Sequence, residues 1–117
     1  MAEKMKIDYD KENDVLFVSK NKKVSDSLEI DKFVIDFLKD GSVGGVEIMD
    51  ASKLISNLSS IKIGKEDLEN IEEAKIKYYK SKELVYVVLL LKIVVREAIE
   101  SISLQIPAPK KAMLAYN

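Results

Sequence analysis

Apolar and polar side chains alternate along the first fifty residues, with the two-residue period of half-buried strands. Met5, Ile7 and Tyr9, for example, alternate with charged residues. Clusters of polar turn residues divide the pattern into short runs. The pattern predicts five strands, at 5–10, 15–18, 24–30, 33–38 and 43–49.

The segment around Asp40-Gly41 predicts a hairpin, because Asp-Gly between two apolar runs is a strong signal for a two-residue turn. With that loop, Ile35 lies opposite Val46 on the core face of the strand pair. The opposite face carries Asp36 and Glu47 on neighbouring strands. The hairpin therefore combines one apolar face with one face that holds two carboxylates.

A short helix is predicted after the fifth strand, over residues 51–59. Asp50 is a suitable N-cap residue for it, because a short carboxylate can accept hydrogen bonds from the first free backbone N–H groups. Leu54, Ile55 and Leu58 then form one apolar stripe along the helix.

The rest of the chain has two interpretations. A short helical pattern at 65–73 precedes a long segment rich in Val and Ile, which favours strands. We expect a three-stranded meander, at about 74–80, 83–95 and 100–106. Pro107 and Pro109 are expected to end the last strand. The alternative is one long buried helix over 84–104.

These elements predict an α+β protein, mostly antiparallel β with one or two short helices after the fifth strand and then a β meander. A length of 117 residues fits a single compact domain, 1–117. Within it we expect a first β unit with its helix at 5–60 and a β-rich extension at 61–106 that shares the same core. A loose tail is expected at 107–117.

The composition removes several kinds of chemistry. The chain contains no Cys and no His, which excludes thiol nucleophiles, disulfides, iron–sulfur clusters and sites that depend on imidazole. Carboxylate chemistry, Lys chemistry and oxygen-only metal sites remain. We therefore expect no catalytic residue, metal or other cofactor, and we favour a protein that is not an enzyme.

The charges are nearly balanced, with a net charge of −1, so they give no general attraction to nucleic acid or to anionic membranes. The longest apolar run, 84–95, is too short for a transmembrane helix and contains Lys92. The charged N-terminus lacks the apolar segment of a signal peptide, so we expect a cytoplasmic protein. Abundant Glu, Lys and Ile without Cys favour a thermophilic source.

Several short segments of the first half carry a family resemblance. Their sequences are IDYD at 7–10, DVLFV at 14–18, VIDF at 34–37, DG at 40–41 and VGGVEIMDAS at 43–52. Together they resemble a small prokaryotic domain family of unknown function, over residues 5–58. The resemblance implies a compact antiparallel β unit followed by one helix. Some members are regarded as neighbours of small-toxin genes, which implies an antitoxin or partner-binding role.

Carboxylates form the first candidate site. They are Asp8, Asp10, Asp14, Asp36, Glu47 and Asp50. Gathered on neighbouring strands, such groups hold Mg²⁺ or Ca²⁺, or they act as an acid–base pair in a hydrolase centred on Asp36 and Glu47. The simpler interpretation, which we favour, gives them roles in turns, helix capping and salt bridges.

A basic and aromatic segment forms the second candidate site. Its residues are Lys75, Lys77, Tyr78, Tyr79, Lys80 and Lys82. Lysines neutralise phosphates and tyrosine rings stack on bases, so the segment is a nucleic-acid candidate. The simpler interpretation, which we favour, is a sheet edge that lysines protect from the addition of further strands.

The apolar run 84–95 forms the third candidate site, because both of its alternating sets of side chains are apolar. An antiparallel strand with one solvated face normally has one polar set. We therefore predict a homo-oligomer, with a tentative interface at Val85, Val87, Leu89, Leu91 and Ile93. The alternative is a central strand that a single chain covers on both faces.

The sequence favours a non-enzymatic interaction or assembly module that binds further copies of itself. A protein partner such as a small toxin is compatible with this function. The first alternative is an antitoxin-like or nucleic-acid-binding regulator that uses the segment 75–82. The second is a carboxylate-dependent hydrolase.

Overall fold

The computed structural model of the protein describes residues 5–80, 82 and 84–109. Five short strands come first: β1 (Lys6–Asp10), β2 (Val15–Ser19), β3 (Asp26–Ile30), β4 (Phe33–Phe37) and β5 (Val43–Ile48). Two helices follow, α1 (Ala51–Ser59) and α2 (Lys65–Leu68). Three long strands complete the fold: β6 (Ile71–Lys80), β7 (Leu84–Val95) and β8 (Ala98–Pro109).

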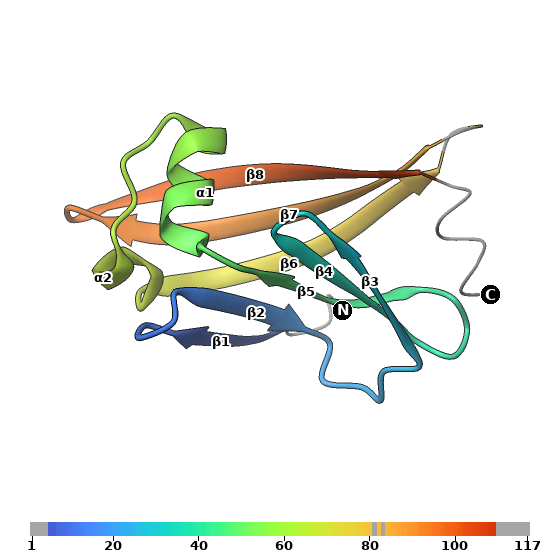
Figure 1. Ribbon diagram of the computed structural model, residues 1–117. Helices are drawn as coiled ribbons and strands as arrows, with labels where there is room; N and C mark the ends of the chain where they lie inside the picture. Colours follow the sequence, from blue (N-terminus) through green and yellow to red (C-terminus); the bar gives the residue numbers. More distant parts are fainter. Residues whose placement is uncertain (1–4, 81, 83, 110–117) are drawn as a thin grey trace.

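The strands form two antiparallel sheets. The first has the order β1-β2-β5-β4-β3, and the second has the order β6-β7-β8 (Figure 1). This arrangement confirms the predicted α+β class, with short helices after the fifth strand and then a three-stranded meander. The alternative of one long helix over 84–104 is wrong, because the β-branched residues of β7 and β8 pair along their whole length.

One hydrophobic core joins the two sheets and both helices. The short strands contribute fully buried residues such as Leu16 and Ile35, and α1 contributes Ile55. The three-stranded sheet contributes one of its two faces, with Leu89 and Leu104 at its centre. In Figure 1, α1 lies across β7 and β8, while the short strands lie below the long sheet.

The hairpin between β4 and β5 has the predicted register in its strands but a different loop. Ile35 pairs with Val46, as predicted. The loop has three residues rather than two, because Leu38 N donates to Ser42 O at 2.9 Å and Gly41 takes the left-handed conformation with φ 84°. A bulge between Asp36 and Phe37 accommodates the change in register.

The predicted N-cap of α1 is wrong in its chemistry. Asp50 occupies the N-cap position, but it has a left-handed conformation and its side chain makes no capping hydrogen bond. Its carboxylate pairs with Lys32 at 3.2 Å instead. The apolar stripe is also shorter than predicted, because Leu58 is 52 % exposed.

Two boundaries in the second half differ from the prediction. The helix expected at 65–73 ends at Leu68, because Ile71 already pairs with Ile93 in the long sheet. The last strand passes through Pro107 instead of ending there. Proline is tolerated because β8 is an edge strand, where one side of the backbone needs no ladder partner.

Candidate functional site

A buried group of polar side chains joins the turn between β1 and β2 to the start of α1. The hydroxyl of Tyr9 donates to Asp14 Oδ1 at 2.7 Å. The hydroxyl of Ser52 donates to Asp14 Oδ2 at 2.7 Å, and the Ser52 backbone N–H donates to Asp14 Oδ1 at 3.0 Å. Asp14 therefore caps α1 from a distant turn, which is the role expected of Asp50.

These contacts fix the charge state of Asp14. Burial alone would raise the pKa of this carboxyl, but the hydrogen bonds from Tyr9 and Ser52 outweigh it and hold the pKa below its ordinary value. Burial, followed by the hydrogen bond to Asp14, raises the pKa of Tyr9. The polar atoms of these side chains have partners within the group, and the group joins the two segments.

The remaining carboxylates of the first candidate site lie apart from Asp14. Asp8, Asp10, Asp36 and Glu47 line a shallow hollow of about 530 Å³ on the solvent side of the five-stranded sheet. Asp36 Oδ1 accepts a hydrogen bond from Ser27 at 2.6 Å. Among the described residues, no group of three or more carboxylates has the geometry to hold a metal ion.

The tentative interface residues of β7 lie in the core of the chain itself. Val87, Leu89, Leu91 and Ile93 are at most 1 % exposed, because they point toward the five-stranded sheet and the helices. The side chain of Val85 lies outside the described part of the chain. A partner that approaches β7 therefore meets the other set of side chains.

We call the opposite side of the three-stranded sheet its outer face. Its central row contains four half-buried apolar residues, Tyr86, Val88, Leu90 and Val94, and one exposed charged residue, Lys92. The flanking rows are exposed and mostly polar, with Lys75 and Lys77 on β6 and with Ser101, Ser103 and Gln105 on β8. The outer face is thus an apolar stripe between polar margins.

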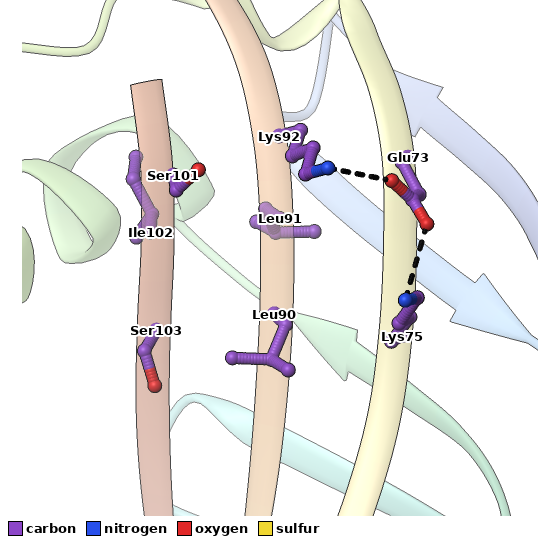
Figure 2. Close-up of a pocket in the computed structure, with 8 residues that line it drawn as sticks. All are labelled: Glu73, Lys75, Leu90, Leu91, Lys92, Ser101, Ile102 and Ser103. Atoms are coloured by element: carbon purple, nitrogen blue, oxygen red, sulfur yellow. Dashed lines mark ion pairs between the residues drawn. The ribbon is translucent and has the colours of Figure 1, made fainter. Parts of the chain in front are cut away.

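A groove of about 220 Å³ crosses this outer face (Figure 2). Leu90 lies between Lys75 on one side and Ser103 on the other, as the strand register requires. Glu73 pairs with Lys92 at 3.2 Å and with Lys75 at 3.4 Å. The hydrogen bond from Lys92, reinforced by Lys75, holds the pKa of Glu73 below its ordinary value.

The basic and aromatic segment is divided between the two faces of β6. Lys77 and Tyr79 lie on the outer face with Lys75, whereas Tyr78 lies on the core side and is 40 % exposed. Lys82 is exposed, and the side chain of Lys80 lies outside the described part. Alternation along a strand thus separates the two tyrosines, which the linear sequence places together.

Sequence reasoning missed two features of these sites. Asp14 and Ser52 are 38 positions apart in the chain, so no local pattern indicates their contact. The helical pattern over 65–73 includes Glu73, so it does not indicate that Glu73 lies opposite Lys92 on the sheet. None of the helices in the described segments is both long and apolar enough to cross a membrane.

Comparison with known proteins gives the following relatives. The chain is 50 % identical over 54 residues to an uncharacterized protein of Methanocaldococcus jannaschii. The matched region covers 45 % of this chain and 47 % of that protein. The chain is also 39 % identical over 74 residues to a Methanosarcina mazei protein named "Putative hypoxanthine phosphoribosyltransferase". This matched region covers 61 % of the chain and 55 % of the Methanosarcina mazei protein.

The matched regions thus span about half the length of both relatives. No solved structure matches the chain. Residues 6–52, which include Tyr9, Asp14 and Ser52, match the family described as "Protein of unknown function (DUF2283)", and this match confirms the resemblance predicted from the sequence.

Proposed function

We propose that the protein is a non-enzymatic interaction module that self-associates through its three-stranded sheet. The observation that carries the proposal is the unequal burial of the two faces of β7. The core face is fully buried within the chain, whereas the apolar row on the outer face is flanked by exposed residues. A central strand with two apolar faces but one solvated side is typical of a surface that a partner covers.

Exposed apolar side chains at both margins of the sheet support the same conclusion. Tyr79 on β6 is 56 % exposed, and Ile99 on β8 is 62 % exposed. Together with Leu90 they spread apolar surface across the three strands. The net charge of −1 means that copies of the chain repel one another weakly. A second copy is therefore the partner that we propose.

Sedimentation velocity and light scattering at micromolar concentration test this proposal. We expect a mass that is a multiple of the 13.2 kDa chain mass, with dissociation on dilution. The variant Glu47→Gln, which changes the solvent side of the five-stranded sheet, is the matched control and should assemble like the wild type. A monomer at all these concentrations refutes the proposal.

Nucleic-acid binding is the second candidate function, because Lys75, Lys77 and Tyr79 share the outer face. The ion pairs of Glu73 with Lys75 and Lys92 oppose this function, because they partly neutralise the positive charge on that face. A mobility shift with single- and double-stranded oligonucleotides at about 50 mM salt tests it. Binding that Lys77→Glu abolishes would support the candidate, and no shift would exclude it.

A further inference from the structure

The turn between β7 and β8 determines which backbone groups of β8 point away from β7. Arg96 and Glu97 both have positive φ values, 48° and 69°, as in a two-residue type I′ hairpin. In such a hairpin the closing pair, Val95 and Ala98, is bonded through both backbone N–H groups. Hydrogen-bonded and non-bonded pairs then alternate along the strands, so every second residue of β8 directs its N–H and C=O to the free edge.

Two independent observations give the same assignment. Val94, the partner of Ile99, donates its N–H to Asn70 O at 3.2 Å, away from β8. Pro107, which has no N–H, lies opposite Tyr86 at one of the positions that this alternation leaves without a bond to β7. The edge-directed positions are Ile99, Ser101, Ser103 and Gln105.

The side chains along this part of β8 leave the edge unprotected. From Ser101 to Ile106 the strand carries no charged residue. Ile99 adds an exposed apolar side chain at the start of the run. Native sheets normally protect such an edge with lysine or proline. Here prolines are present at positions 107 and 109, which leaves 101–106 without a protecting residue.

We propose that β8 pairs antiparallel with β8 of a second copy, so that two three-stranded sheets become one continuous sheet. This inference rests on the proposed self-association, but it places the contact between the two copies at the edge of β8 rather than on the outer face. Antiparallel pairing of identical strands follows naturally from a two-fold axis. Edge-directed residues pair with edge-directed residues, so Ser101, Ser103 and Gln105 of one copy face the same set in the other. The core faces of both sheets stay on one side.

The charges of the sheet favour this arrangement over stacking of the two outer faces. The outer face carries three lysines, Lys75, Lys77 and Lys92. In the rows described above, one carboxylate, Glu73, opposes them. Two such faces in contact would bring cationic groups together in a partly dry interface. The edge segment 101–106 carries no charge that has to be desolvated.

A pair of substitutions at Ser103 tests the inference. Ser103→Pro removes one edge-directed N–H without removing a hydrogen bond to β7, and the same strand already contains prolines. Ser103→Ala removes the hydroxyl but keeps the N–H. We expect Ser103→Pro to raise the dissociation constant of the dimer at least about tenfold, whereas Ser103→Ala remains a dimer. Circular dichroism checks that both variants are folded.

The outer-face variant Leu90→Lys separates this inference from the proposed function. A dimer that persists in Leu90→Lys and weakens in Ser103→Pro supports edge pairing. Edge pairing is overturned if the Ser103→Pro variant remains a dimer, or if the Leu90→Lys variant dissociates. Either result leaves self-association in place. A monomeric wild type overturns both.

Amide hydrogen exchange of the wild type provides a measurement that does not depend on a variant. The N–H groups of Ile99, Ser101, Ser103 and Gln105 should exchange slowly at high protein concentration and rapidly on dilution. Fast exchange of all these amides in a dimeric sample would overturn the inference. This test remains valid if the Ser103→Pro variant does not fold.

Discussion

Asp14 shows how a single buried carboxylate connects two distant segments. Its two oxygens accept hydrogen bonds from the side chains of Tyr9 and Ser52 and from the Ser52 backbone. Its backbone O also accepts from Ala51 N at 2.9 Å. The helix α1 therefore begins where it does because the β1–β2 turn presents an acceptor there.

The variant Asp14→Asn should lower the free energy of unfolding by about 1–3 kcal/mol at pH 7, because the charged acceptor at the helix N-terminus is lost. Denaturant unfolding measures the effect. Asp8→Asn, on the solvent side of β1, is the matched control and should change stability by less than about 0.5 kcal/mol. An Asp14→Asn protein as stable as the wild type would contradict the capping role.

The same carboxylate predicts a pH dependence. The pKa of Asp14 is lower in the folded protein than its ordinary value, so its stabilising effect is present above the unfolded-state pKa of about 3.9 and is lost as the pH falls through the folded-state pKa. The difference in stability between wild type and Asp14→Asn should therefore be largest near neutral pH and shrink in acid. An unchanged difference between pH 7 and pH 2.5 would argue against this linkage.

At the scale of elements, the turn between β7 and β8 is short and strained. Arg96 and Glu97 occupy left-handed positions that glycine or asparagine normally takes in such a turn. Two long strands that pair from Leu84 to Pro109 hold this conformation in place. The cost of the turn is thus offset by the ladder that it closes.

The variant Glu97→Gly should raise the free energy of unfolding by about 1 kcal/mol, because glycine adopts a positive φ without a steric penalty. Thermal and denaturant unfolding measure the gain. Glu100→Gly, three residues later within β8, should instead lower stability by about 0.5–1 kcal/mol. Equal losses in the two variants would show that the left-handed conformation carries no strain.

Local pattern predicted much of the element order. The alternation of apolar residues located the short strands, and α1 has the predicted bounds. The predicted pairing of Ile35 with Val46 is correct, although it was deduced from a two-residue loop. The loop has three residues, and the bulge between Asp36 and Phe37 offsets the extra one, which the local sequence does not indicate. The cap of α1 also escaped prediction, since Asp14 reaches it only through the tertiary fold.

For the tentative interface, the sequence named a row of β7 that the structure places in the core of the chain. Both alternating sets of β7 are mostly apolar, and Lys92, in the set of Leu90, is the one local indication of the side that faces solvent. The structure assigns the core to Leu89 and its row, and leaves Leu90 and its row on the outer face. Packing against α1 and the five-stranded sheet decides the choice, because a single lysine in a long apolar run is a weak periodic signal.

At the scale of the whole molecule, one core spans both sheets, although the family match stops at residue 52. An ion pair of 3.0 Å between Lys11 and Glu69 also joins the first half to the second. We therefore expect the two halves to unfold in one transition.

Two core variants test this expectation. Leu16→Ala in β2 and Leu89→Ala in β7 should each lower the free energy of unfolding by about 2–5 kcal/mol. Each variant should lower the unfolding midpoint of the entire protein. Circular dichroism and hydrogen exchange of both sheets measure the transitions. If Leu89→Ala shifted the long sheet alone, the two halves would be separate folding units.

The contact between Asp14 and Ser52 also bears on the order of events during folding. The nine residues of α1 are too few to form a stable helix alone, and the side chain at its own N-cap position makes no capping hydrogen bond. The helix therefore gains its cap only after the β1–β2 turn has formed and the two segments have met. Formation of α1 is in this sense a late, long-range step, and a transient opening of the turn would release the helix with it.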